Sequence, residues 1–335
     1  MQVLTEIAKA LVSPGKGILA MDASTPTMTK RMEALGIEST EDSRRDFREL
    51  LVTTQGLGEY ISGAILYDET IHQKLSNGKT FVGALEAAGI IPGIKVDAGL
   101  KDMPNHPGEK ITEGLDGLRD RLVGYSQMGA RFAKWRAAIA IGNGIPTQDC
   151  IEVNAEELAR YALLCQEVGL VPIVESEVLM NSDHTIDRCL QVTEEVLQTV
   201  FKYLTMQGVV LEGIILKPNM VLPGLICPVQ KSVDEVADTT VKCLLRFVPA
   251  NVAGIAFLSG GQSSKLASAR LNAMNAKFKS RLPWALTFSF SRAIQYPALE
   301  IWNGKETYVL AAQQALYHRA KCNQAARLGE YNVKM

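Results

Sequence analysis

Eight short apolar runs recur along the chain, and each leads into a polar or charged residue. Runs that are so continuously apolar are typical of strands buried on both faces of a parallel sheet. We therefore predict eight strands, within Gly17–Asp22, Ile61–Tyr67, Pro92–Asp97, Ala130–Arg136, Leu170–Glu177, Gly213–Lys217, Asn251–Leu258 and Pro283–Ser289.

Amphipathic helices are expected between these runs. Apolar residues recur at helical spacing from residue 1 to 12, from Thr112 to Gly129 and from Asp183 to Gln207. Two residue pairs have the form of an N-terminal cap followed by an acid, namely Asn154 with Glu157 and Ser232 with Glu235. Gly169 and Gly208 are expected to end the helices that precede them.

Strands that alternate with helices favour one α/β domain over residues 1–335, a (β/α)₈ TIM barrel with extra N-terminal and C-terminal helices. An open doubly wound sheet is the alternative. Against that alternative, the chain has no Gly-x-Gly-x-x-Gly turn and no phosphate loop ending in Gly-Lys-Ser/Thr.

Composition excludes several classes of protein. The formal net charge is −1, so no global basic field favours nucleic acid. Six cysteines without paired spacing indicate reduced core thiols in a cytoplasmic protein. The first residues do not have the pattern of a signal peptide, and no apolar run reaches the roughly 18 residues that a membrane span needs, so neither is expected.

Polar residues at the strand ends are expected to meet at one mouth of the barrel, where such folds carry out chemistry. Among them, Lys217 ends the sixth run just before a proline. A lysine that continues an apolar row is partly desolvated, which favours its neutral and nucleophilic amine. Two alternatives stay open: Lys217 reaches water, or the whole charged set is a solvated rim.

Two further features extend this hypothesis. A second ammonium beside Lys217 would favour the neutral form of the Lys217 amine, and Lys134 is the expected neighbour. The alternative is that Lys134 forms a structural ion pair with Glu175 or Glu177. The turn from Ser259 to Gln262 contains two glycines and can point backbone N–H groups at an anion. Four scattered histidines give no metal-ligand spacing, so neither a metal nor a cofactor is expected.

At these residues the chain resembles the class I fructose-bisphosphate aldolases, from about residue 4 to about residue 331. The resemblance rests on several blocks in order: Gly17–Ser24, Gly93–Asp97, Phe132–Arg136, Val171–Glu177, Leu216–Val221, Phe257–Ser263 and Trp284–Ser289 before Arg292.

The resemblance implies a role for each matching residue. It implies Lys217 as the Schiff-base lysine, Glu175 as general acid and base, and Asp22, Lys134 and Glu177 as further catalytic residues. It implies substrate binding by Arg31, Arg44, Lys95, Arg136, Ser259, Gly260, Gly261, Ser289 and Arg292.

Some positions depart from the better-known animal pattern. Ala23, Ala98, Ser176 and Ser291 replace a glutamate, a lysine, a proline and a glycine, respectively. The sequence also stops at Tyr331–Met335, without the tail whose terminal tyrosine assists enamine protonation in animal relatives. These changes affect the expected balance between bisphosphate and monophosphate substrates.

The expected function is therefore the glycolytic, reversible cleavage of fructose 1,6-bisphosphate into dihydroxyacetone phosphate and glyceraldehyde 3-phosphate by a cytoplasmic homotetramer. The expected partners are phosphorylated ketoses and triose phosphates, with neither nucleic acid nor membrane. Alternatives are a Schiff-base aldolase that prefers sedoheptulose bisphosphate or fructose 1-phosphate, and a scaffold that keeps the fold without catalysis.

Overall fold

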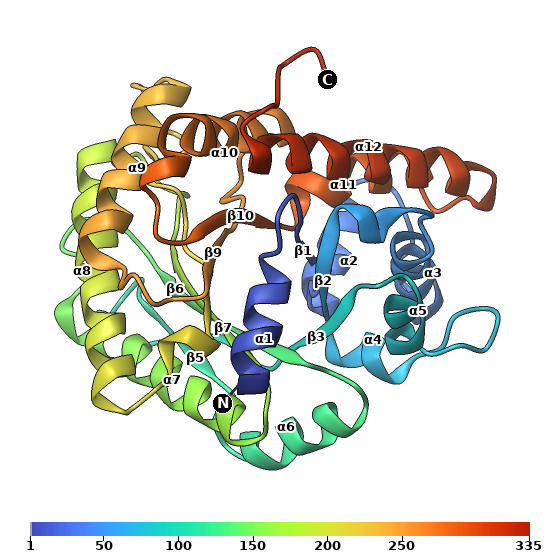
Figure 1. Cartoon of the computed structure of the whole chain (residues 1–335), viewed down its shortest axis with the longest axis horizontal. Coiled ribbons are helices and arrows are strands. Elements are labelled where there is room, and N and C mark those ends of the chain that lie inside the picture. Colours follow the sequence, from blue (N-terminus) through green and yellow to red (C-terminus); the bar gives the residue numbers. More distant parts are fainter. Residues whose placement is uncertain (1) are drawn as a thin grey trace.

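The computed structural model describes residues 2–335, in which eight parallel strands close into a barrel (Figure 1). Their order around the barrel is β1-β10-β9-β8-β7-β6-β3-β2. The expected α/β barrel is thus confirmed. The strands are β1 Gly17–Ala20, β2 Ile61–Leu66, β3 Ile91–Lys95, β6 Phe132–Ile139, β7 Val171–Val178, β8 Ile215–Leu216, β9 Gly254–Phe257 and β10 Ala285–Phe290.

Helices surround the barrel, and short 3₁₀ turns lie between some of them. The helices are α1 Gln2–Leu11, α2 Thr25–Glu33, α3 Glu41–Val52, α4 Asp68–His72, α5 Phe81–Ala87, α6 Leu118–Gln127, α7 Gln148–Glu167, α8 Ile186–Met206, α9 Val233–Phe247, α10 Ser264–Phe278, α11 Arg292–Trp302 and α12 Val309–Leu328. The 3₁₀ turns are Leu57–Glu59, Leu211–Gly213, Lys279–Arg281 and Glu306–Tyr308. Among residues 2–335, no helix has the length and apolar character needed to cross a membrane.

Helix α1 lies across one end of the barrel (Figure 1). Leu4, Ala8 and Leu11 recur at helical spacing and are buried in one apolar cluster with barrel residues such as Phe132 and Ile215. Because these side chains fill the N-terminal end of the barrel, only the C-terminal ends of the strands are left for a cleft.

The C-terminal helix α12 packs beside α10 and α11 on the outside of the barrel (Figure 1). It ends at Gly329, whose φ of +82° closes the helix in a left-handed conformation. The expected extra helices at both ends of the chain are therefore present. All six cysteines are buried and unpaired, as the spacing of their positions predicted.

The capping predictions were right at one helix and wrong at another. Ser232 and Glu235 form a capping box at the start of α9, as expected. Helix α7 instead begins after Thr147, whose hydroxyl accepts from the backbone N–H of Cys150. Asn154 is a buried residue inside α7, where its side-chain amide donates to the carbonyls of Cys150 and Lys110.

The helix expected from Thr112 to Gly129 was wrong in its first part. Residues Lys110–Glu113 form strand β5, which pairs antiparallel with β4 (Gly99–Asp102) in a hairpin beside the barrel. Gly114 and Gly117 have φ values of +127° and +65°, conformations that end a helix and favour glycine. Helix α6 therefore starts only at Leu118.

The sixth strand is also shorter than expected. Strand β8 contains only Ile215 and Leu216, because Gly213 belongs to a 3₁₀ turn. Ile215 lies in the apolar interior of the barrel, so the apolar row that Lys217 continues starts at Ile215. Lys217 follows β8 at the mouth, and its backbone N–H donates to the carbonyl of Val174 on β7.

Replacing Glu157 by glutamine should stabilise the fold at alkaline pH. Burial raises the pKa of Glu157 to about 7, although the backbone N–H of Thr112 donates to its carboxylate at 3.3 Å. The unfolded-state pKa is about 4.3, so folding favours the protonated acid and stability falls as pH rises from about 4 to 7. Because the side chain is only partly buried, we expect a gain of about 1 kcal/mol at pH 8.

The measurement is urea unfolding of wild type and Glu157→Gln at pH 4 and pH 8. At pH 4 the two proteins should differ little, because both side chains are then neutral. If the stability difference between Glu157→Gln and wild type is the same at pH 8 as at pH 4, the raised pKa of Glu157 is contradicted.

Candidate active site

A cleft of about 1240 Å³ opens at the C-terminal ends of the barrel strands. Residues on or just after β1, β3, β6, β7, β8, β9 and β10 line it, together with residues of α2 and α11. It brings together every site residue predicted from the sequence except Arg44. Parallel strands explain this convergence, because their carboxyl ends all meet at the same mouth.

Four charged side chains form a continuous row at the centre of the cleft. Lys217 is 3% exposed, and its Nζ lies 3.2 Å from Oε1 of Glu175. The other carboxylate oxygen of Glu175 lies 3.2 Å from Nζ of Lys134, which lies 2.7 Å from Oδ2 of Asp22. Two amines therefore alternate with two carboxylates, all four of them largely buried at the base of the cleft.

Burial and ion pairing act against each other on these groups. Burial by itself would raise the pKa of Asp22, but the ammonium groups of Lys134 and Lys217 outweigh burial and hold this pKa well below its usual value. The pKa of Glu175 is lowered in the same way, against burial, by Lys134 and Lys217. Burial would lower the pKa of Lys134, but Asp22 and Glu175 hold it well above its usual value.

Lys134 is thus not the uncompensated cation expected beside Lys217. Two carboxylates compensate its charge, and the ion-pair alternative describes its geometry better, with Glu175 rather than Glu177 as the partner. Register explains the arrangement: Lys134 pairs with Ile173 across β6 and β7, and Glu175 lies two residues further along the same face of β7.

Two further cations, one at the end of β3 and one within β6, each have an acidic partner. Lys95 Nζ is 2.7 Å from Oδ1 of Asp97, and Arg136 Nε is 2.5 Å from Oε2 of Glu177. The carboxylates orient both cations in the absence of a bound anion. They also reduce the positive charge on this side of the cleft.

The turn after β9 has the geometry of an anion site. Gly260 and Gly261 have φ values of +55° and +79°, which a residue with a Cβ adopts only under strain. The backbone N–H of Gln262 donates to the carbonyl of Ser259 at 3.0 Å. Within residues 2–335 the backbone N–H groups of Gly260 and Gly261 have no hydrogen-bond acceptor, so they are available to an anion.

Three positive side chains that follow β1 or β10 also line the cleft. Within the described chain, Lys30, Arg31 and Arg292 line the cleft and form no salt bridge. Arg31 donates to the hydroxyl of Ser291 at 3.3 Å, and the buried hydroxyl of Ser289 has no partner among these residues. The two sides of the cleft therefore differ: within residues 2–335 the cations that follow β1 and β10 form no salt bridge, whereas those on β3 and β6 each form one.

Comparison with known proteins identifies the family. The model of the glycolytic class I fructose-bisphosphate aldolases matches residues 3–335. The chain is 55% identical over 329 residues to a Xanthomonas campestris protein named "Probable fructose-bisphosphate aldolase class 1", with 98% of each chain covered. It is 50% identical to cytosolic fructose-bisphosphate aldolase 4 of Arabidopsis thaliana, covering 95% of this chain and 81% of the relative.

This protein belongs to the class I fructose-bisphosphate aldolases. The fold agrees, because a solved aldolase from Plasmodium falciparum, in complex with TRAP and a small molecule inhibitor, matches at a TM-score of 0.96 and 47% identity. That match covers 99% of this chain and 95% of the other. The aldolase is a lyase that acts on phosphorylated sugars, as its sequence predicted.

The structure places Arg44 of this aldolase outside the cleft. Its guanidinium forms a salt bridge with Glu69 of α4, and Arg48 contacts the same carboxylate. Helix α3 thus directs Arg44 towards α4, and Arg44 is not among the residues that line the cleft.

Sequence reasoning missed several polar residues that line the aldolase cleft. They are Ser24, Lys30, Tyr67, Ser291 and Tyr296. Lys30 had a usable signal, because it precedes Arg31 on the helix that follows the first strand. The others had none, because single serines and tyrosines in loops and helices are common.

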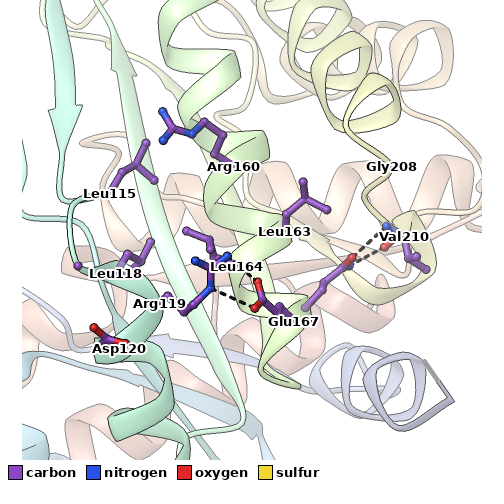
Figure 2. A pocket seen from close by; sticks show the side chains of 12 residues that line it. Leu115, Leu118, Arg119, Asp120, Arg160, Leu163, Leu164, Glu167, Gly208 and Val210 are labelled. Atoms are coloured by element: carbon purple, nitrogen blue, oxygen red, sulfur yellow. Dashed lines mark hydrogen bonds and ion pairs between the residues drawn. The ribbon is translucent and has the colours of Figure 1, made fainter.

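A second groove, of about 850 Å³, lies on the outside of the barrel between α6 and α7 (Figure 2). Arg119 and Glu167 form a salt bridge across it, and Gln166 exchanges hydrogen bonds with the backbone of Val210. These polar groups already satisfy one another. Within residues 2–335, no three Asp, Glu, His or Cys side chains could hold a metal ion.

Proposed function

We propose that Lys217 of this aldolase forms the Schiff base with C2 of fructose 1,6-bisphosphate. The observation that carries the proposal is a buried lysine amine at the end of β8 with a carboxylate oxygen at 3.2 Å. Glu175 stays ionised near neutral pH, because Lys134 and Lys217 lower its pKa against burial. Its ionised oxygen lies 3.2 Å from the amine of Lys217, where it can take a proton from that amine as the amine attacks the carbonyl.

The proposed reaction then follows from the same row of charges. The amine adds to C2, and Glu175 returns a proton to the leaving hydroxyl, so that water departs and an iminium forms. Glu175, again a carboxylate, then takes the proton of the C4 hydroxyl, and the C3–C4 bond breaks to release glyceraldehyde 3-phosphate. The electron pair of that bond forms the C2=C3 double bond of an enamine, while the π electrons of the iminium move to its nitrogen. Protonation at C3 and addition of water release dihydroxyacetone phosphate and restore Lys217.

Asp22 and Lys134 have supporting roles in this proposal. Their ion pair places a carboxylate and an ammonium beside Glu175, within reach of the substrate hydroxyl groups. We assign Asp22 to orient those hydroxyls and assist cleavage, and Lys134 to stabilise negative charge near the iminium. Glu177 acts through Arg136, which it contacts.

The two sides of the cleft suit the two phosphates. Strands β8, β9 and β10 are neighbours, so the turn after β9 lies next to Lys217 and suits the phosphate on C1, the carbon bonded to C2. Ser259, Gly260, Gly261, Ser289, Arg31 and Arg292 would bind it there. Lys95 and Arg136 lie across the barrel on β3 and β6 and suit the phosphate on C6.

We further propose that residues 1–335 act as one domain and that the enzyme works in the cytoplasm as a homotetramer. The cytosolic Arabidopsis relative supports the location, and the family supports the assembly. Light scattering of the purified protein distinguishes a tetramer from a monomer, and cell fractionation tests the location.

A coupled assay of purified enzyme tests the function. Fructose 1,6-bisphosphate should be cleaved to triose phosphates with a kcat of roughly 1–10³ s⁻¹, as is typical of enzymes, and EDTA should leave the rate unchanged. The same assay with sedoheptulose bisphosphate and fructose 1-phosphate ranks the substrates by kcat/KM. A higher kcat/KM for either of them than for fructose 1,6-bisphosphate would overturn the proposed substrate.

A further inference from the structure

Arg270, in the second turn of α10, is a buried cation without an acidic partner in the described chain. Its side chain is 5% exposed, and its Nε is buried without a hydrogen-bond acceptor. Burial lowers the pKa of Arg270, and no nearby acid opposes this effect. An arginine still remains protonated near neutral pH, so the helix carries an uncompensated charge in a place where charge is costly.

A short hydrogen bond links this guanidinium to the turn after β9. Nη1 of Arg270 donates to Oε1 of Gln262 at 2.8 Å. Because arginine only donates hydrogen bonds, Gln262 must present its oxygen to Arg270 and its NH₂ group to the other side. That NH₂ group donates to the carbonyl of Ser259 at 2.9 Å.

These contacts fix the orientation of the backbone groups in the turn. The carbonyl of Ser259 accepts from both the side chain and the backbone N–H of Gln262, so it is held towards Gln262. Among the described residues, the N–H groups of Gly260 and Gly261 have no acceptor, and their turn lines the cleft. Helix α10 begins directly after the turn, and its N-terminal end also favours an anion there.

We propose that Arg270 is a positioning residue for the substrate phosphate next to the ketone. It holds Gln262 and thereby the turn in the conformation that receives the phosphate, and its charge stabilises the bound dianion from behind. A phosphate in the turn supplies the negative charge that this buried guanidinium lacks. The inference rests on the proposed function, because it takes the C1 phosphate to bind at this turn.

In the condensation direction, the two phosphates are on separate substrates. Dihydroxyacetone phosphate carries the phosphate next to the ketone, and glyceraldehyde 3-phosphate carries the other. Arg270→Met should raise the KM for dihydroxyacetone phosphate about tenfold, with kcat and the KM for glyceraldehyde 3-phosphate changed by less than about twofold. Arg270→Lys, which keeps the charge, should raise the first KM only about threefold. The inhibition constant of inorganic phosphate should rise by the same factors.

Arg327 on α12 offers a matched control. It too is a buried arginine with an unpartnered Nε and a pKa lowered by burial alone, but its Nη1 contacts Asn275 and not the turn. Arg327→Met should therefore leave both KM values unchanged, whatever it costs in stability.

Equal rises in both KM values, or the same KM change in Arg327→Met, would overturn the role of Arg270. If Arg270→Met does not fold, Gln262→Ala provides a second test, because it breaks the link while keeping the charge, and it should raise the same KM. Borohydride labelling of Lys217 with saturating substrate should persist in all these variants. Absence of that label in the wild type would instead remove the proposed function.

Discussion

Replacing Lys217 by methionine should abolish aldol cleavage, with kcat/KM reduced by at least about 10⁴-fold. Methionine fills a similar volume in a site where Lys217 is 3% exposed, but it has no amine to bond to C2. Without the iminium, the electron pair of the C3–C4 bond has no acceptor, and binding by the remaining cleft residues cannot replace one. The measurement is the coupled assay, together with mass spectrometry after borohydride reduction in the presence of substrate.

Lys95→Met is the matched control for this experiment. Lys95 also lines the cleft, but it pairs with Asp97 at the end of β3 and lies away from β8. The Lys95 variant should bind substrate more weakly and still give a substrate adduct on Lys217. An adduct of the same yield in Lys217→Met would place the Schiff base on another amine.

Much of the fold could be predicted because burial leaves a simple pattern in this sequence. Strands covered on both faces are continuously apolar, so the runs ending near Lys134, Glu175 and Lys217 were visible without coordinates. A parallel barrel then requires that their ends meet, so the central site followed from topology.

Other features depend on backbone conformation and not on apolar spacing. The β4–β5 hairpin was missed because its apolar residues also fit a helix, and the deciding glycines, Gly114 and Gly117, act through positive φ values. Asn154 was taken for a cap because its spacing to Glu157 fits one, whereas the helix starts at Thr147. Local sequence could not reveal that Asn154 bonds the hairpin at Lys110.

Side-chain partners were the least predictable part of the site. Arg44 lies one turn before Arg48 on α3, and both contact Glu69 on a helix that follows another strand. Lys134 was expected as a cation beside Lys217, but its position relative to Asp22 depends on how β1 and β6 face each other across the barrel. Such contacts are set by the closed barrel and leave no local pattern in the sequence.

Glu175→Gln should lower kcat by about 10²–10⁴-fold with a much smaller change in KM, because general acid–base transfer is lost while the phosphate sites remain. An amide cannot accept the Lys217 proton or return one to the leaving hydroxyl. It also leaves Lys134 with Asp22 as its only acidic partner within ion-pair distance in the described chain. Rapid-quench borohydride trapping should show slower formation of the iminium, by the same factor as kcat.

Replacing the neighbouring carboxylate, Glu177, tests whether the loss of Glu175 acts through proton transfer or only through the lost negative charge. Glu177 lies two residues along β7 and pairs with Arg136, and it has no ion pair with Lys217 in the described chain. Glu177→Gln should therefore affect mainly KM, through Arg136, and leave the rate of iminium formation within about tenfold of wild type. Equal losses of that rate in both variants would assign the effect to net charge in the cleft. If iminium formation is not slower in Glu175→Gln, another group must be the acid and base. Asp22 is the remaining carboxylate of the row.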